Sequence, residues 1–203
     1  MHYIPRIASA SILLISLVSC GSGRLTHAEK RLIEEGEGLM KVYTIADRED
    51  SLLLRQKSAM FSKSDLKSDT YRKLAERMLA TVTDPSQDGV GIAGPQVGLL
   101  RRVVAVQRFD KEGNPFEVYP NVTLEKIGSE TCMGGEGCLS VPNMRGTVER
   151  SACVRICYTD PVSLKESVDT VSGFTAVIFQ HECDHLDGVL YIDRMTDQKS
   201  IGR

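Results

Sequence analysis

The chain has 203 residues and a formal net charge of −2, which argues against a nucleic-acid-binding protein, because such proteins carry an excess of basic residues. Its 41% hydrophobic content is enough to build the core of one globular domain, and an aromatic content of only 5% predicts that this core is mainly aliphatic. The length beyond one compact domain lies at the N-terminus.

Residues 1–20 are predicted to be a lipoprotein-type signal peptide. The apolar run from Ile7 to Val18 is too short to span a bilayer comfortably, but it suits the hydrophobic region of a secretory signal. The segment Leu17-Val18-Ser19-Cys20-Gly21 then resembles a bacterial lipobox, in which Cys20 is lipidated and becomes the new N-terminus. This predicts a membrane anchor through Cys20 and a position outside the cytoplasm. The alternatives are a buried strand or an untranslated upstream stretch.

Residues 21–40 are polar and rich in Gly and Glu, and we interpret them as a tether or a loosely held first helix before a catalytic domain at 41–203. The first clear helix begins with Ser68 or Asp69 as its N-cap and ends before Asp84-Pro85. Its apolar residues fall on one face at helical spacing: Tyr71, Leu74, Met78, Leu79 and Val82.

Short strands are predicted next. A buried strand over 102–107 and a returning strand over 116–119 are separated by the turn residues 110–114, which predicts a hairpin. Further strands are expected near 122–126, 146–150 and 153–158, and a final strand over 189–192. A helix from about Val171 to Gly188 precedes that last strand, with Phe174, Val177, Ile178, His181 and His185 on its inner face. This order predicts an α+β fold, with antiparallel or mixed sheets around a central helix.

The helix near the C-terminus carries the motif His181-Glu182-Cys183-Asp184-His185. Residues four apart on a helix lie nearly above one another, so the two imidazoles point at a common spot. Glu182 projects to the flank of that spot, where a carboxylate can exchange a proton with a metal-bound water. The motif predicts two metal ligands and a general base, and it leaves the third ligand open.

Two glycine-rich segments precede this helix. Residues 89–96 contain the pattern G-x-G-x-x-G, but no convincing strand precedes it and Gly94-Pro95 cannot readily open a helix, so a dinucleotide site is not predicted. Its glycines instead let a ligand backbone come close. In the second segment, residues 136–140, Cys138 lies among glycines, where its thiolate is either a metal ligand or a structural cysteine.

In this order and spacing, residues 89–96, 136–140 and 180–185 resemble the three motifs of peptide deformylases. The resemblance extends over about 40–196 and implies the peptide deformylase fold, with the metal motif on its central helix. One departure is Gly94, where alanine is the commoner residue.

The resemblance implies a metal held by Cys138, His181 and His185, with Fe²⁺ as the native ion and Zn²⁺, Ni²⁺ or Co²⁺ as ions that the same donors accept. It implies that a metal-bound hydroxide attacks the formyl group of an N-formylmethionyl peptide and that formate is released, with Glu182 as general acid and base. Two groups are implied to stabilise the negative oxygen, the Gln96 side chain and the Leu139 backbone N–H. The implied substrate-binding residues are Gly89, Val90, Gly91, Arg145, Val177 and Ile178.

Two other functions remain open from the sequence. A zincin-type metallopeptidase would need a third ligand downstream of His185, where Asp187, Asp193 and Asp197 are the available acids. A non-catalytic lipoprotein could keep the same fold for binding. The compartment is also open: nascent chains are the substrates if Met40 starts a cytoplasmic form, and exported formylated peptides are the substrates if Cys20 is lipidated.

Overall fold

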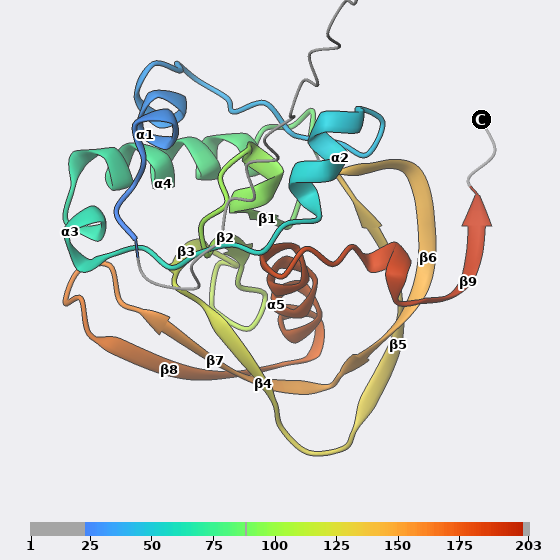
Figure 1. Cartoon of the computed structure of the whole chain (residues 1–203). Helices are drawn as coiled ribbons and strands as arrows, with labels where there is room; N and C mark the ends of the chain where they lie inside the picture. The colour runs from blue at the N-terminus through green and yellow to red at the C-terminus, as the bar shows by residue number, and fades with distance from the viewer. Residues whose placement is uncertain (1–22, 88, 201–203) are drawn as a thin grey trace, which may run out of the picture.

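The computed structural model describes residues 23–87 and 89–200 (Figure 1). The predicted lipobox with Cys20 lies outside these residues. The α+β prediction is confirmed: three antiparallel sheets of three strands each surround a central helix, α5 (Gly173–Leu186), which contacts strands of all three. Within the described ranges, no helix has both the length and the apolar character needed to cross a bilayer.

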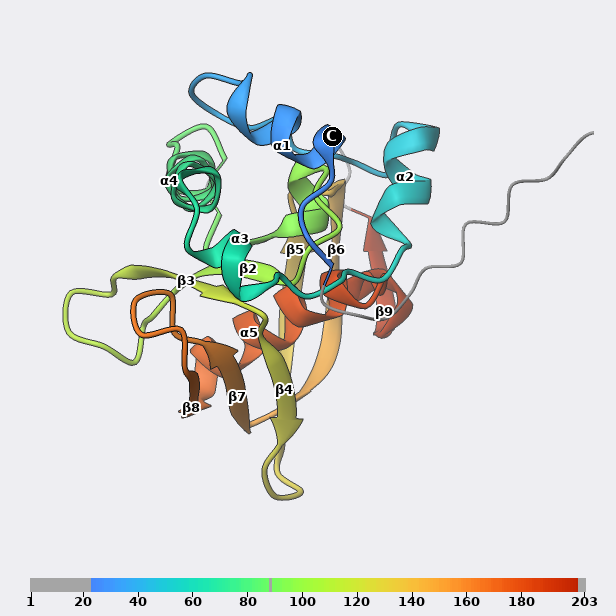
Figure 2. The ribbon, with the colours of Figure 1, turned by 60° about the vertical axis from the view of Figure 1, so that its left-hand side comes forward.

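Helices of the N-terminal part cover one side of the molecule (Figure 2). They are α1 (His27–Glu34), α2 (Arg48–Leu54), α3 (Lys63–Leu66) and α4 (Asp69–Val82). As predicted, Ser68 caps α4, because its side chain accepts a hydrogen bond from the backbone N–H of Tyr71. Tyr71, Leu74 and Met78 on its apolar face are buried in a cluster that includes Ile92 and Val103 of the first sheet.

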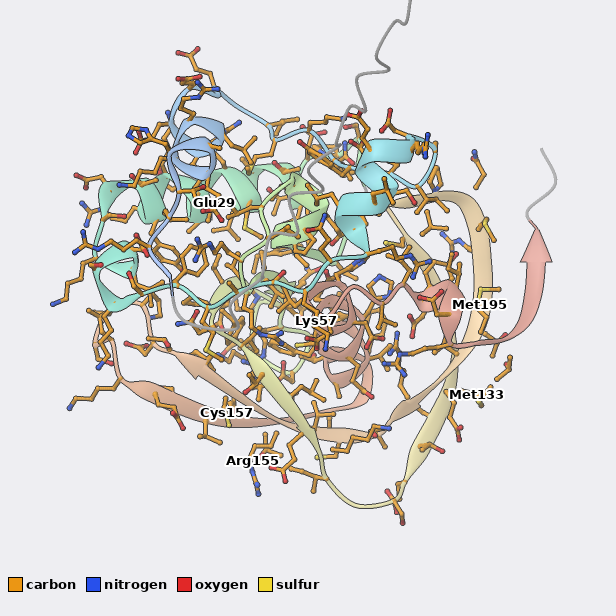
Figure 3. The ribbon with its side chains drawn as sticks, viewed as in Figure 1. Glu29, Lys57, Met133, Arg155, Cys157 and Met195 are labelled. Carbon is orange, nitrogen blue, oxygen red and sulfur yellow. The ribbon has the colours of Figure 1, made fainter. Side chains whose placement is uncertain are left out.

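Of the two interpretations of residues 21–40, a tether or a loosely held first helix, the described part contains a helix, α1, and this helix is packed firmly on the domain. Thr26 and Glu29 form a capping box that starts α1, and Ile33 on this helix is fully buried. Glu29 accepts hydrogen bonds from the buried Arg101 guanidinium at 2.6 and 2.8 Å. Figure 3 shows the Glu29 side chain on the side of α1 that faces the rest of the domain. This segment is therefore part of the folded domain.

The three sheets have the strand orders β1-β2-β3, β4-β7-β8 and β5-β6-β9. The predicted hairpin is confirmed, since β2 pairs with β3 and Val104 lies opposite Tyr119. The strand bounds are β1 (Gly91–Ala93), β2 (Val103–Gln107), β3 (Phe116–Pro120), β4 (Thr123–Lys126), β5 (Thr131–Cys138), β6 (Val141–Ser151), β7 (Cys153–Thr159), β8 (Glu166–Ser172) and β9 (Met195–Ser200). A short 3₁₀ helix, η1 (Gly94–Val97), follows β1.

The segments around α5 correct three predictions. The helix begins at Gly173, whose φ of +61° turns the chain out of β8, and not near Val171. Phe174 is 55% exposed, so it does not lie on the inner face of the helix. The predicted strand over 189–192 is replaced by a 3₁₀ helix, η2 (Tyr191–Asp193), with strand β9 after it. The predicted end at Gly188 is confirmed by its positive φ of +74°.

Candidate active site

Two elements that are distant in sequence bring the predicted metal ligands together. Cys138 ends β5, and His181 and His185 lie one turn apart on α5. Ligand atoms of the three side chains all lie within 4.8 Å of one another, and the Cys138 Sγ is 3.2 Å from the His185 Nε2. One thiolate and two imidazoles form a donor set that suits a divalent transition metal and leaves room for a further ligand.

His181 is oriented by a carboxylate that the sequence analysis missed. Its Nδ1 lies 2.8 Å from Glu136 Oε2, so Nδ1 carries the proton and Nε2 is left to bind a metal. Glu136 also accepts hydrogen bonds from the Arg150 guanidinium at 2.7 and 2.9 Å. Burial alone would raise the pKa of Glu136, but the hydrogen bonds from Arg150 and His181 outweigh it and lower the pKa to about 2. Glu136 therefore stays ionised and holds the ring.

His185 is kept in the form that binds metals. It is 1% exposed, and this burial lowers its pKa well below the ordinary value of histidine. A neutral imidazole has a free lone pair for a metal ion. The ring nitrogen that faces Cys138 is therefore available to a metal ion at neutral pH.

Glu182 lies in the same cavity and is only 4% exposed. Burial raises its pKa to about 7, a value at which a carboxyl group can both accept and donate a proton near neutral pH. Its Oε2 has no hydrogen-bond partner among the described residues. A buried oxygen of this kind suits contact with a water molecule or a substrate.

The Gln96 side chain is fixed with its amide nitrogen toward Cys138. Its Oε1 accepts a hydrogen bond from the Ala93 backbone N–H at 2.8 Å, which determines the orientation of the amide. Its Nε2 then lies 3.2 Å from the Ser140 Oγ and 3.5 Å from the Cys138 Sγ. Gly94, the departure noted above, lies in the same turn. A Cβ at this position would lie 2.5 Å from the Arg101 carbonyl oxygen, which is too close, so the turn as it stands here requires glycine.

A cavity of about 620 Å³ opens onto these groups. Of the residues predicted for the site, all except His185 line it: Gly89, Val90, Gly91, Gln96, Cys138, Leu139, Arg145, Val177, Ile178, His181 and Glu182. Phe174, which was predicted on the inner face of the helix, also lines the cavity. The helical spacing of apolar residues indicates that they share one face of the helix. It does not indicate whether that face packs against the core or lines a cavity.

The structure does not favour the zincin alternative. Asp187 pairs with Arg102 at 2.8 Å, and Asp193 accepts hydrogen bonds from Arg55 and from the Leu190 backbone N–H. Among the described side chains, the residue that joins the two histidines is Cys138. The candidate third ligand thus lies upstream of the helix, Asp187 and Asp193 serve ion pairs, and the side chain of Asp197 lies outside the described part of the chain.

Comparisons of the sequence with known proteins agree with this arrangement. The polypeptide deformylase family model matches residues 40–200. A peptide deformylase of Leptospira biflexa serovar Patoc is 36% identical over 157 residues, which cover 74% of this chain and 86% of that protein. Peptide deformylase 2 of Gloeobacter violaceus is 38% identical over 168 residues, covering 80% of this chain and 82% of that protein.

Solved structures lead to the same family. A class I type b peptide deformylase from Acinetobacter baumannii with bound K1U has a TM-score of 0.69 and 37% identity, covering 78% of this chain and 100% of that one. A class I type b peptide deformylase from that organism with bound Met-Ala-Ser has a TM-score of 0.68 and 34% identity, covering 77% and 98%. The chain therefore belongs to the peptide deformylase family, the hydrolases of protein biosynthesis that remove the formyl group from N-formylmethionyl peptides.

Proposed function

We propose that Cys138, His181 and His185 hold the divalent metal of this deformylase and that Glu182 transfers the protons of the reaction. The observation that carries this proposal is the convergence of the three ligand atoms, within 4.8 Å of one another, beside a buried glutamate in one cavity. When bound, the metal would lower the pKa of a water molecule and polarise the formyl oxygen.

The residues of the chain account for the remaining chemistry. Glu182 accepts a proton from the attacking water as the water oxygen bonds to the formyl carbon. The C–N bond then breaks, formate leaves, and the proton held by Glu182 passes to the amine of the peptide. A carboxyl group with a pKa of about 7 suits both transfers.

Negative charge on the formyl oxygen needs fixed hydrogen-bond donors. We assign this role to the Gln96 side-chain amide, which its hydrogen bond with Ala93 holds in place, and to the Leu139 backbone N–H. Both residues line the cavity. Removing one donor of this kind typically lowers kcat about 10²–10³-fold.

This cavity is the proposed binding site of an extended formylated peptide. We propose that its backbone pairs with residues 89–91 and with the segment after Cys138, as an added strand. Val90, Val177 and Ile178 would contact the methionine side chain, with Arg145 at the rim. The structural neighbour with bound Met-Ala-Ser supports a substrate of this type.

The roles of Glu182 and Cys138 can be separated by experiment. The Glu182→Gln variant should keep its metal but release formate from formyl-Met-Ala-Ser about 10²–10⁴-fold more slowly, since general acid–base catalysis contributes about that much. Cys138→Ser should lose the metal, whereas Cys132→Ser, a half-buried cysteine outside the ligand group, should retain both metal and activity. An active Glu182→Gln enzyme, or full metal content in Cys138→Ser, would refute the assignment.

Fe²⁺ is our proposal for the native metal, with Zn²⁺, Ni²⁺ and Co²⁺ as substitutes, because one thiolate and two imidazoles accept any of these ions. Metal analysis of protein purified from its native source without air tests this. We expect the purified protein to contain iron. A fully active sample that contains only zinc would contradict the proposal.

We also propose that the enzyme is a lipoprotein anchored through Cys20 and that it acts on exported formylated peptides. The lipobox and the packing of α1 support this, since a form that starts at Met40 would lack a helix of the domain. Mass spectrometry of the native N-terminus is the test. A diacylglyceryl Cys20 is expected, and a native chain starting at Met40 would instead indicate a cytoplasmic enzyme that acts on nascent chains.

A further inference from the structure

A buried arginine anchors the loop that follows β2. Arg108 is 2% exposed, and it donates hydrogen bonds to both carboxylate oxygens of Asp110 at 2.8 and 2.6 Å. It also donates to Asp169 on β8 at 2.9 Å and to the Tyr119 hydroxyl on β3. A guanidinium out of contact with water needs such partners, and together they fix both its own position and that of the residues beside it.

The same loop is attached to the start of α5. The side chain of Thr175, a residue that is 1% exposed in the first turn of α5, interacts with the Asp110 carboxylate. Phe109 lies between Arg108 and Asp110 in the chain, so its backbone is held on both sides. The loop therefore has a fixed position relative to the helix that carries the two histidines.

This attachment brings two aromatic rings into contact. The Phe109 and Phe174 ring centroids are 5.2 Å apart with an interplanar angle of 49°. Both side chains are partly exposed, Phe109 at 39% and Phe174 at 55%. Phe174 lines the catalytic cavity beside Val177 and Ile178, whereas Phe109 is not among the described residues that line it.

We propose that Phe109 is a positioning residue that holds Phe174 in the cavity wall and thereby tightens the binding of the apolar side chain of the formylated residue. This inference rests on the proposed substrate-binding role of the cavity. An exposed phenylalanine on a helix end would otherwise lose rotamer freedom on contact with a ligand. A neighbouring ring that already restricts it reduces this entropic cost and so strengthens ground-state binding.

The expected signature is a change in KM without a change in kcat, because neither ring is part of the proton-transfer machinery. With formyl-Met-Ala-Ser, Phe109→Ala should raise KM about two- to tenfold, the range expected for the loss of one aromatic pair, and leave kcat within about twofold. With formyl-Ala-Ala-Ser the rise should be smaller, since a methyl group has little surface to place against Phe174. Phe109→Tyr keeps the ring and should retain the wild-type KM.

Coupling between the two rings is tested in the Phe174→Ala background. There, Phe109→Ala should leave KM nearly unchanged, because the contact it supports is already gone. Leu52→Ala, which shortens an exposed leucine of α2 outside the cavity, is the matched control and should have the wild-type KM.

Three outcomes would overturn the inference: an unchanged KM in Phe109→Ala, additive effects in the double variant, or a raised KM in Phe109→Tyr. A wild-type enzyme that releases no formate would contradict the proposed function itself. Failure of the proposed function is therefore distinguishable from failure of the inference about Phe109.

Discussion

At the scale of single residues, Gly91 limits the space beside Glu182, the proposed general acid and base. A Cβ built on Gly91 would lie 2.5 Å from Glu182 Oε1 and 2.9 Å from Ile178 Cγ2. Gly91→Ala should therefore displace the carboxylate, and a shift of about 1 Å at a reacting group can cost about 10²-fold in rate. We expect a kcat about 10–10²-fold lower, with metal content close to wild type.

Gly134→Ala is the matched control, because a Cβ at that position of β5 meets no atom within 4 Å. It should keep the wild-type kcat in the same formate-release assay. A wild-type kcat in Gly91→Ala would show that Glu182 can move aside and still transfer protons.

At the scale of elements, α1 is joined to the domain through a buried charge. Arg101 is 5% exposed and pairs with Glu29, and it also donates to the backbone carbonyls of Gly23 and Arg24. A chain that starts at Met40 would leave this guanidinium without those partners and would lose the buried side chains of Leu25 and Ile33. Each of these two buried aliphatic side chains contributes about 1.5–3 kcal/mol, and the lost contacts of Arg101 add to this.

The form that starts at Met40 should consequently have a Tm about 10 °C or more below that of a chain starting at Gly23, as measured by circular dichroism. Equal Tm values for the two chain lengths would mean that α1 adds nothing to the stability of the domain.

Whether a helix or strand could be predicted from the sequence depends on how clear its local pattern of residues is. Helix α4 has a cap and a long apolar period, so its start at Ser68 and its inner face could be predicted. Strand β5 contains three glycines in Thr131–Cys138, and these hide the alternation by which a strand is found. Helix α1 has eight residues and a buried face that depends on Arg101, far along the chain, so its packing could not be predicted from local sequence.

At the scale of the whole molecule, the grouping of Cys138, His181 and His185 beside Glu182 could be predicted, because these residues lie in local motifs. The groups that orient them could not, since they come from separate elements. Glu136 on β5 pairs with Arg150 on β6, and Arg150 also donates to Asp184 on α5 at 2.6 Å. Arg194, after η2, donates to the same Asp184 at 2.6 and 2.7 Å. Only the fold brings these charges into one network that ends at His181.

Removing Arg150 should affect both the stability of the domain and its metal binding. Arg150→Met would leave Glu136 as a buried carboxylate without its cation, which typically costs about 3–5 kcal/mol, and would loosen the group that orients His181. Loss of such an orienting partner typically weakens metal binding about 10–100-fold. Arg155→Met on β7 is the control, because Arg155 pairs with Glu125 at the surface, where an ion pair contributes about 0–1 kcal/mol. Urea unfolding of the metal-free proteins and competition with a chelator should therefore separate the two variants, and equal behaviour would show that the network does not hold His181.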